Sequence, residues 1–161
     1  MLGLVGGYLL WKLLHILAVL AFVMSHGVSS WVAIRLRSER DRMRIAELLQ
    51  LSGSSVQAMY VSLGLLILFG VVAGFAGQWW SRWWIWLALL ILVLMIGEMT
   101  AVASPYYKRL KEAVEVRPSG VPRRSDEELE EMLRSPVATM TIVLGFAALA
   151  VLTWLMVLKP F

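Results

Sequence analysis

Long apolar runs, separated by three polar segments, dominate the pattern of this 161-residue chain. An α-helix needs about 20 apolar residues to cross the hydrocarbon core of a bilayer. Four runs reach that length, and they predict membrane spans at about residues 11–34, 56–77, 83–103 and 136–158. The pattern therefore predicts an all-α fold, a four-transmembrane-helix bundle. It forms a single transmembrane domain over residues 1–161, with connections at 35–55 and 104–135.

The composition supports a membrane protein. Hydrophobic residues make up 60% of the chain and charged residues 16%, whereas soluble domains average about 45–50% apolar residues. A soluble domain of this size has no place to bury so much apolar surface, so we expect the lipid bilayer to be its main partner. Cysteine is absent, which excludes disulfides, thiolate metal sites and iron–sulfur clusters.

Basic residues are concentrated in two of the three connections. Five arginines lie within residues 35–44 and seven lysines or arginines within 108–134, whereas the connection between the second and third spans holds only Arg82. By the positive-inside rule, both basic connections are cytoplasmic, and the N-terminus and C-terminus lie outside. This distribution accounts for the net charge of +4 without a nucleic acid partner. We expect a multi-pass protein of the cell (inner) membrane.

The two cytoplasmic connections carry local helix signals. Ser38 followed by Asp41 is typical of a capping box, and Gly53 is a candidate stop for the helix that follows. Ser125 with Glu128 three residues later predicts the start of a second short helix. These signals predict short cytoplasmic surface helices.

Ionisable residues are rare within the predicted spans: Lys12, His15, His26 and Glu98. Because such groups are costly in lipid, each needs a partner, a cavity or a function. His15 and His26 are eleven residues apart, so at 100° per residue they share one helix face, about 16.5 Å apart along the axis. Neutral imidazole ligates haem iron, and a four-helix bundle can enclose a porphyrin. The alternative is an imidazole hydrogen-bonded to another helix.

Glu98 is the only acid within a predicted span. It lies fifteen residues after Trp83, and His26 lies fifteen residues after Trp11, so the two side chains have similar depths in spans of the same direction. We therefore predict a His26–Glu98 pair. It would carry protons, orient a ligating imidazole or act only as an internal polar contact.

Two other residue types suggest different cofactors. Met24 is near His26, and Met95 and Met99 flank Glu98, so thioethers are available to copper(I). Met is also an ordinary filler of apolar cores. A tryptophan-rich segment at the second connection is typical of an interfacial anchor and is also a candidate platform for a quinone. Its members are Trp79, Trp80, Trp83, Trp84 and Trp86.

Gly70 and Gly74 form a GxxxG step in the second span. Small residues at this spacing let two helices approach closely. The step predicts a helix-packing face, either within the chain or toward a partner.

Short motifs at both ends of the chain carry a resemblance. Lys12 and His15 form a Lys-x-x-His start, Arg35 and Arg37 follow the first span, and the last span closes on Lys159-Pro160. The chain resembles an uncharacterised family of predicted bacterial four-helix integral membrane proteins. It is distantly similar to the copper-resistance-D membrane domain and to membrane-bound protoporphyrinogen oxidase. The resemblance implies haem b bound through the first-span histidine, which His15 matches, or a quinone environment.

The leading functional expectation is a haem b-binding or redox-associated subunit of a membrane electron-transfer system. His15 is the first candidate ligand and His26 the second, and Lys12 is a candidate partner for a haem propionate. One alternative is a non-catalytic accessory subunit of a larger respiratory or photosynthetic complex, packed against a membrane-protein partner or forming a homo-oligomer. A second alternative is a small metal or solute transporter. Whether the chain is an enzyme stays open.

Overall fold

The computed structural model describes residues 2–160, with side chains from residue 7 onward, and this part of the chain forms helices and no β-strand. The all-α prediction is therefore confirmed. The elements in chain order are α1 (Leu2–Leu36), α2 (Arg42–Ala76), η1 (Trp79–Ser81), α3 (Trp83–Glu98), η2 (Met99–Ala103), α4 (Ser104–Val114), α5 (Asp126–Leu133) and α6 (Pro136–Leu158). Four helical stretches are long and apolar enough to cross a membrane: Gly7–Leu36, Arg42–Ala76, Trp83–Val114 and Asp126–Leu158.

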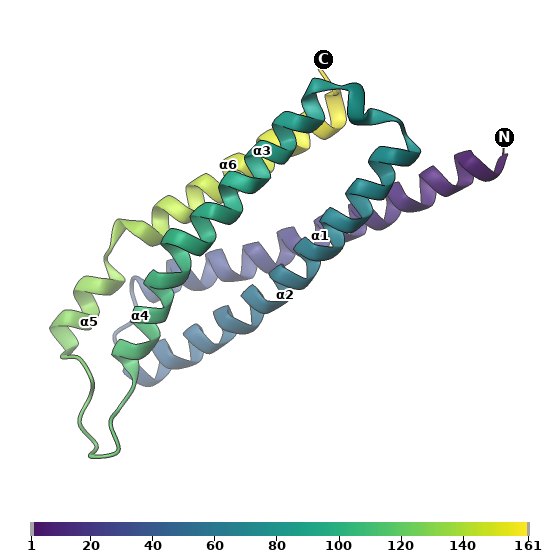
Figure 1. The fold of residues 1–161 in the computed structure, drawn as a ribbon. Coiled ribbons are helices and arrows are strands. Elements are labelled where there is room, and N and C mark those ends of the chain that lie inside the picture. Colours follow the sequence, from purple (N-terminus) through teal and green to yellow (C-terminus); the bar gives the residue numbers. More distant parts are fainter. Residues whose placement is uncertain (1, 161) are drawn as a thin grey trace.

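The long helices form two pairs. Helix α1 packs along α2, and α3 packs along α6 (Figure 1). Both chain ends lie at one end of the bundle, and α5 lies at the opposite end (Figure 1). The two pairs meet mainly near α4 and α5, where one buried apolar cluster joins them.

This joining cluster is the main core of the molecule. Leu110 of α4 is fully buried, and Leu129 and Leu133 of α5 pack beside it against residues of α1 and α2. Burying one such side chain contributes about 1.5–3 kcal/mol. The other buried members are Val32, Ala33, Leu36, Ile45, Leu49, Tyr106, Ala113, Val114 and Ala138.

Two arginines form hydrogen bonds that connect the helix ends around this core. Arg37, just after α1, donates to the Thr139 hydroxyl at 2.6 Å and to the Ser135 carbonyl at 3.4 Å, which ties α1 to the start of α6. Arg42 donates to the Ala113 carbonyl at 2.9 Å and so ties the start of α2 to the end of α4. Charged hydrogen bonds of this kind fix the relative position of the two helix pairs.

The start of α2 differs from the prediction. Asp41 is the N-cap, accepting from the Met43 N–H at 2.9 Å, whereas Ser38 donates to the Arg35 carbonyl. Gly53 does not end a helix, because α2 continues without a break to Ala76. Glycine ends a helix when a left-handed residue or a chain reversal follows. Here the apolar helical run continues, and a glycine inside a helix lowers the helix stability by only about 1 kcal/mol relative to alanine.

The second short helix is as predicted. The Ser125 hydroxyl accepts from the Glu128 N–H at 3.2 Å, and the Glu128 carboxylate accepts from the Ser125 N–H at 3.2 Å. This reciprocal capping box begins α5.

A turn of π-helix, η2, joins α3 to α4. Pro105 follows directly, near the start of α4. Proline lacks an N–H, and its ring clashes with the carbonyl four residues earlier, so a continuous α-helix cannot pass through it undisturbed. The wider π-turn accommodates this defect and keeps the long helix continuous. Glu98 is the residue immediately before the turn.

Candidate functional site

His15 points from α1 onto α2. Its Nδ1 lies 2.9 Å from the Leu66 carbonyl oxygen. Since a carbonyl can only accept, Nδ1 carries a proton, and in the neutral imidazole Nε2 is then the nitrogen with the lone pair. The ring rests on Gly70, where a Cβ would lie 2.9 Å from His15 Cε1. Lys12, one turn earlier, is exposed.

His26 points from the same helix toward α6. Its ring stacks with Phe22 at a centroid distance of 6.3 Å and meets Phe146 edge-on at 5.1 Å. A Cβ at Gly145 would lie only 2.5 Å from His26 Nε2. The missing side chain of Gly145 therefore provides the space that the imidazole fills. The two histidines occupy the same face of α1, yet they pack against different helices.

Glu98 faces the same interior as His26 but does not bond to it. The Thr141 hydroxyl of α6 donates to Glu98 Oε1 at 2.7 Å. No hydrogen bond or ion pair between His26 and Glu98 occurs within residues 7–160, although the two groups are close enough to interact electrostatically. Thr141 and Gly145 are one turn apart on α6. One turn of α6 therefore contacts the Glu98 carboxylate, and the next turn contacts the His26 imidazole.

A small cavity of about 70 Å³ lies beside His26, between the two helix pairs. Its wall is mostly apolar and includes Met99 and Ala103 of the π-turn. The remaining lining residues are Ser29, Ser30, Ala33, Val56, Met59, Ser104, Tyr107, Thr141 and Ile142. Pockets for cofactor-sized ligands measure about 300–1,000 Å³, so a porphyrin does not fit beside His26.

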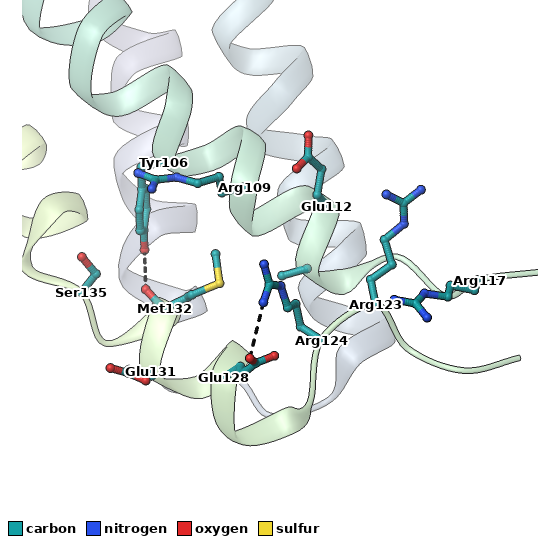
Figure 2. Close-up of a pocket in the computed structure, with 11 residues that line it drawn as sticks. Tyr106, Arg109, Glu112, Arg117, Arg123, Arg124, Glu128, Glu131, Met132 and Ser135 are labelled. Atoms are coloured by element: carbon teal, nitrogen blue, oxygen red, sulfur yellow. Dashed lines mark hydrogen bonds and ion pairs between the residues drawn. The ribbon is translucent and has the colours of Figure 1, made fainter.

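A larger open pocket of about 720 Å³ lies at the other side of α4, between α4, the segment that follows it and α5 (Figure 2). Tyr106 donates to the Met132 carbonyl at its edge, and Arg124 pairs with Glu128 (Figure 2). The pocket contains both charge signs, because Arg109, Arg117 and Arg123 also line it together with Glu112 and Glu131.

Two methionines of the predicted copper set have different surroundings. Met24 is 73% exposed, whereas Met99 lines the cavity beside His26. Within the described part of the chain, no three His, Asp or Glu residues are grouped so as to hold a metal ion.

The tryptophan-rich segment packs on itself and on the C-terminal end. Lys159 Nζ lies 3.9 Å from the centre of the Trp79 ring, a cation–π contact. Trp84 is buried against Leu155. Gly74 receives the Trp80 ring, with a contact of 3.2 Å from a Cβ placed there. Gly70 and Gly74 thus accommodate side chains of this same chain.

Sequence reasoning did not single out Gly145, Thr141 or Pro105. Gly145 was detectable only as an isolated glycine in an apolar helix, and its partner depends on which helix packs against it. Pro105 was visible as a helix-disturbing residue seven positions after Glu98.

Comparisons with protein-family models, curated proteins and solved structures find no match for this chain.

Proposed function

We propose that the chain is a multi-pass inner-membrane protein that carries haem b on His15 and serves a membrane electron-transfer system. The observation that supports this proposal is the hydrogen bond from His15 Nδ1 to the Leu66 carbonyl. An axial haem ligand uses one ring nitrogen for iron, while the other donates to an acceptor that fixes the ring orientation. His15 has this arrangement, since its Nε2 makes no hydrogen bond among residues 7–160.

Each residue around His15 has a defined task in this proposal. The Leu66 carbonyl accepts from Nδ1 and so fixes the orientation of the ring. Gly70 allows the ring to lie close to α2. Lys12 is exposed one turn away, where its ammonium group would pair with a propionate. The haem supplies one-electron redox chemistry when bound.

His26 is not the second ligand in this proposal. Its Nε2 faces Gly145 on α6, and the cavity beside it holds only about 70 Å³. The two histidines are also about 16.5 Å apart along one helix, so they cannot bind opposite faces of one iron. Each chain would therefore hold haem through one histidine, His15.

The same proposal includes an orientation. The basic connection between α1 and α2 lies at the end of the bundle that carries α4 and α5, where Arg42 donates to Ala113 and Arg40 pairs with Glu130. The positive-inside rule places this end in the cytoplasm and both chain ends outside. The Trp79–Ser81 turn then lies at the outer surface.

The test is the absorption spectrum of protein purified in mild detergent from cells supplied with ample haem. We expect a Soret band in the wild type and in His26→Ala, and loss of the band in His15→Ala. Gly70→Ala should weaken the band, because the added Cβ displaces the ring. His26→Ala is the matched control, since it removes the chain's other imidazole. Colourless wild-type protein, or a band that survives His15→Ala, contradicts the proposal and favours an accessory subunit without a cofactor.

A further inference from the structure

Two buried polar atoms near the π-turn have no hydrogen-bond partner within residues 7–160: His26 Nε2 and Glu98 Oε2. Buried polar atoms in folded proteins are nearly always hydrogen-bonded to protein or to ordered water. The two atoms belong to different helix pairs. The His26 ring lines the small cavity between those pairs, and so does Thr141, whose hydroxyl donates to Glu98 Oε1. The unpartnered His26 Nε2 beside this cavity indicates that the cavity holds water.

The size and wall of the cavity are suitable for water. A water molecule needs about 10–15 Å³ of accessible volume and two to four polar partners, and the cavity offers about 70 Å³. Its wall provides the Ser29 and Thr141 hydroxyls, the Tyr107 side chain and the His26 ring. Water in the cavity can therefore connect the imidazole with the Thr141 hydroxyl, which donates to the Glu98 carboxylate.

The charges around the cavity favour a bound proton. His26 of α1 and Tyr107 of α4 are the titratable groups that line the cavity, and Glu98 of α3 is bonded to the wall residue Thr141. Helix α2 contributes Val56 and Met59 to the wall, and α6 contributes Thr141 and Ile142. Among residues 7–160 no Lys or Arg lines the cavity or bonds to Glu98, so a negative charge on this carboxylate would have no cationic partner there, which is costly. One added proton, shared between the two groups, makes the pair neutral.

We propose that His26 and Glu98 form an internal proton-exchange site that works through the water of this cavity. In the uptake step a hydronium ion in the cavity becomes water by giving one proton to the His26 ring, or to Thr141 Oγ1, whose own proton then passes to Glu98 Oε1. In the release step the same bond breaks and the proton returns to water, with no change in oxidation state. The π-turn directly after Glu98 is an independent indication, because such turns occur frequently at functional sites. This site is separate from His15 and requires no haem.

The presence of only two histidines makes a direct test practical. The protein is labelled with ¹⁵N-histidine, and the two imidazole signals are followed by NMR in detergent micelles across pH, with His15→Gln used for assignment. We expect the His26 titration midpoint to be lower by about one pH unit in Glu98→Gln, which removes the neighbouring negative charge. We also expect exchange between the His26 ring and water. The His15 signal should be unchanged, and it reports that the fold is intact.

Thr141→Val provides a second variant that keeps the side-chain shape. It removes the hydrogen bond to Glu98 Oε1, so the shared proton moves toward Glu98, and the His26 midpoint should shift in the same direction by a smaller amount. Equal His26 midpoints in wild type, Glu98→Gln and Thr141→Val would overturn the proposal, as would a His26 ring that shows no exchange with water.

Discussion

Substitution of Gly145 by alanine tests how tightly His26 is held. The new Cβ would lie 2.5 Å from His26 Nε2 and 2.6 Å from Cε1, well inside van der Waals contact. Phe22 and Phe146 flank the ring, so it has little freedom to turn away. Overpacking of this kind costs about 1–3 kcal/mol.

The matched control is Gly64→Ala on α2, where a Cβ meets nothing within 4 Å. Alanine is the better helix former by about 0.5–1 kcal/mol, and this gain applies to both variants. We therefore expect Gly145→Ala to be about 1–3 kcal/mol less stable than Gly64→Ala, measured by equilibrium unfolding in detergent. In a His26→Ala background the difference should vanish, since the space is then free. Equal stability of the two glycine variants with His26 present would refute the reasoning.

Three further predictions concern the polar ends of the bundle. The Asp41 and Arg40 N–H groups donate to the Glu39 carboxylate and hold its pKa below the ordinary value of 4.5. The contribution of Glu39 to stability is therefore full above that value and is lost as pH falls through the lower pKa of the folded state. Glu39→Gln should make the thermal unfolding midpoint less sensitive to acid, and an unchanged pH profile would contradict this. Ser125→Ala should lower stability by about 1 kcal/mol through loss of the capping box, and an unaltered unfolding midpoint would show that α5 does not depend on it. Because the chain has no cysteine, a membrane-impermeant maleimide should label Ser81→Cys in intact cells and Ser119→Cys only after permeabilisation, and the reverse pattern would invert the proposed orientation.

The features that the sequence predicted correctly depend on local signals. Four apolar helical stretches follow from run length, and the α5 capping box follows from Ser125 and Glu128. The error at Gly53 arose because a glycine stops a helix only where the chain must turn, and run length alone does not show this. The N-cap moved to Asp41 for a similar reason, since any of several polar residues could have begun the helix.

The arrangement around the histidines could be predicted only in part. Helical periodicity placed His15 and His26 on one face, but it could not show that one packs on Gly70 of α2 and the other on Gly145 of α6. That result depends on which helices are neighbours. The matched depths of His26 and Glu98 indicated proximity, whereas the hydrogen bond from Thr141 to Glu98 needed the position of a third helix.

The central proposal is that His15 binds haem b. Its most direct test is resonance Raman spectroscopy of reduced His26→Ala protein purified from cells supplied with haem. In this variant His15 is the only imidazole, so ¹⁵N-histidine labelling isolates a single iron–nitrogen bond. We predict an iron–histidine stretching band that shifts to lower frequency with the heavier isotope. Bound haem whose spectrum does not respond to the label, or protein that retains no haem, would contradict the assignment of His15 as the axial ligand.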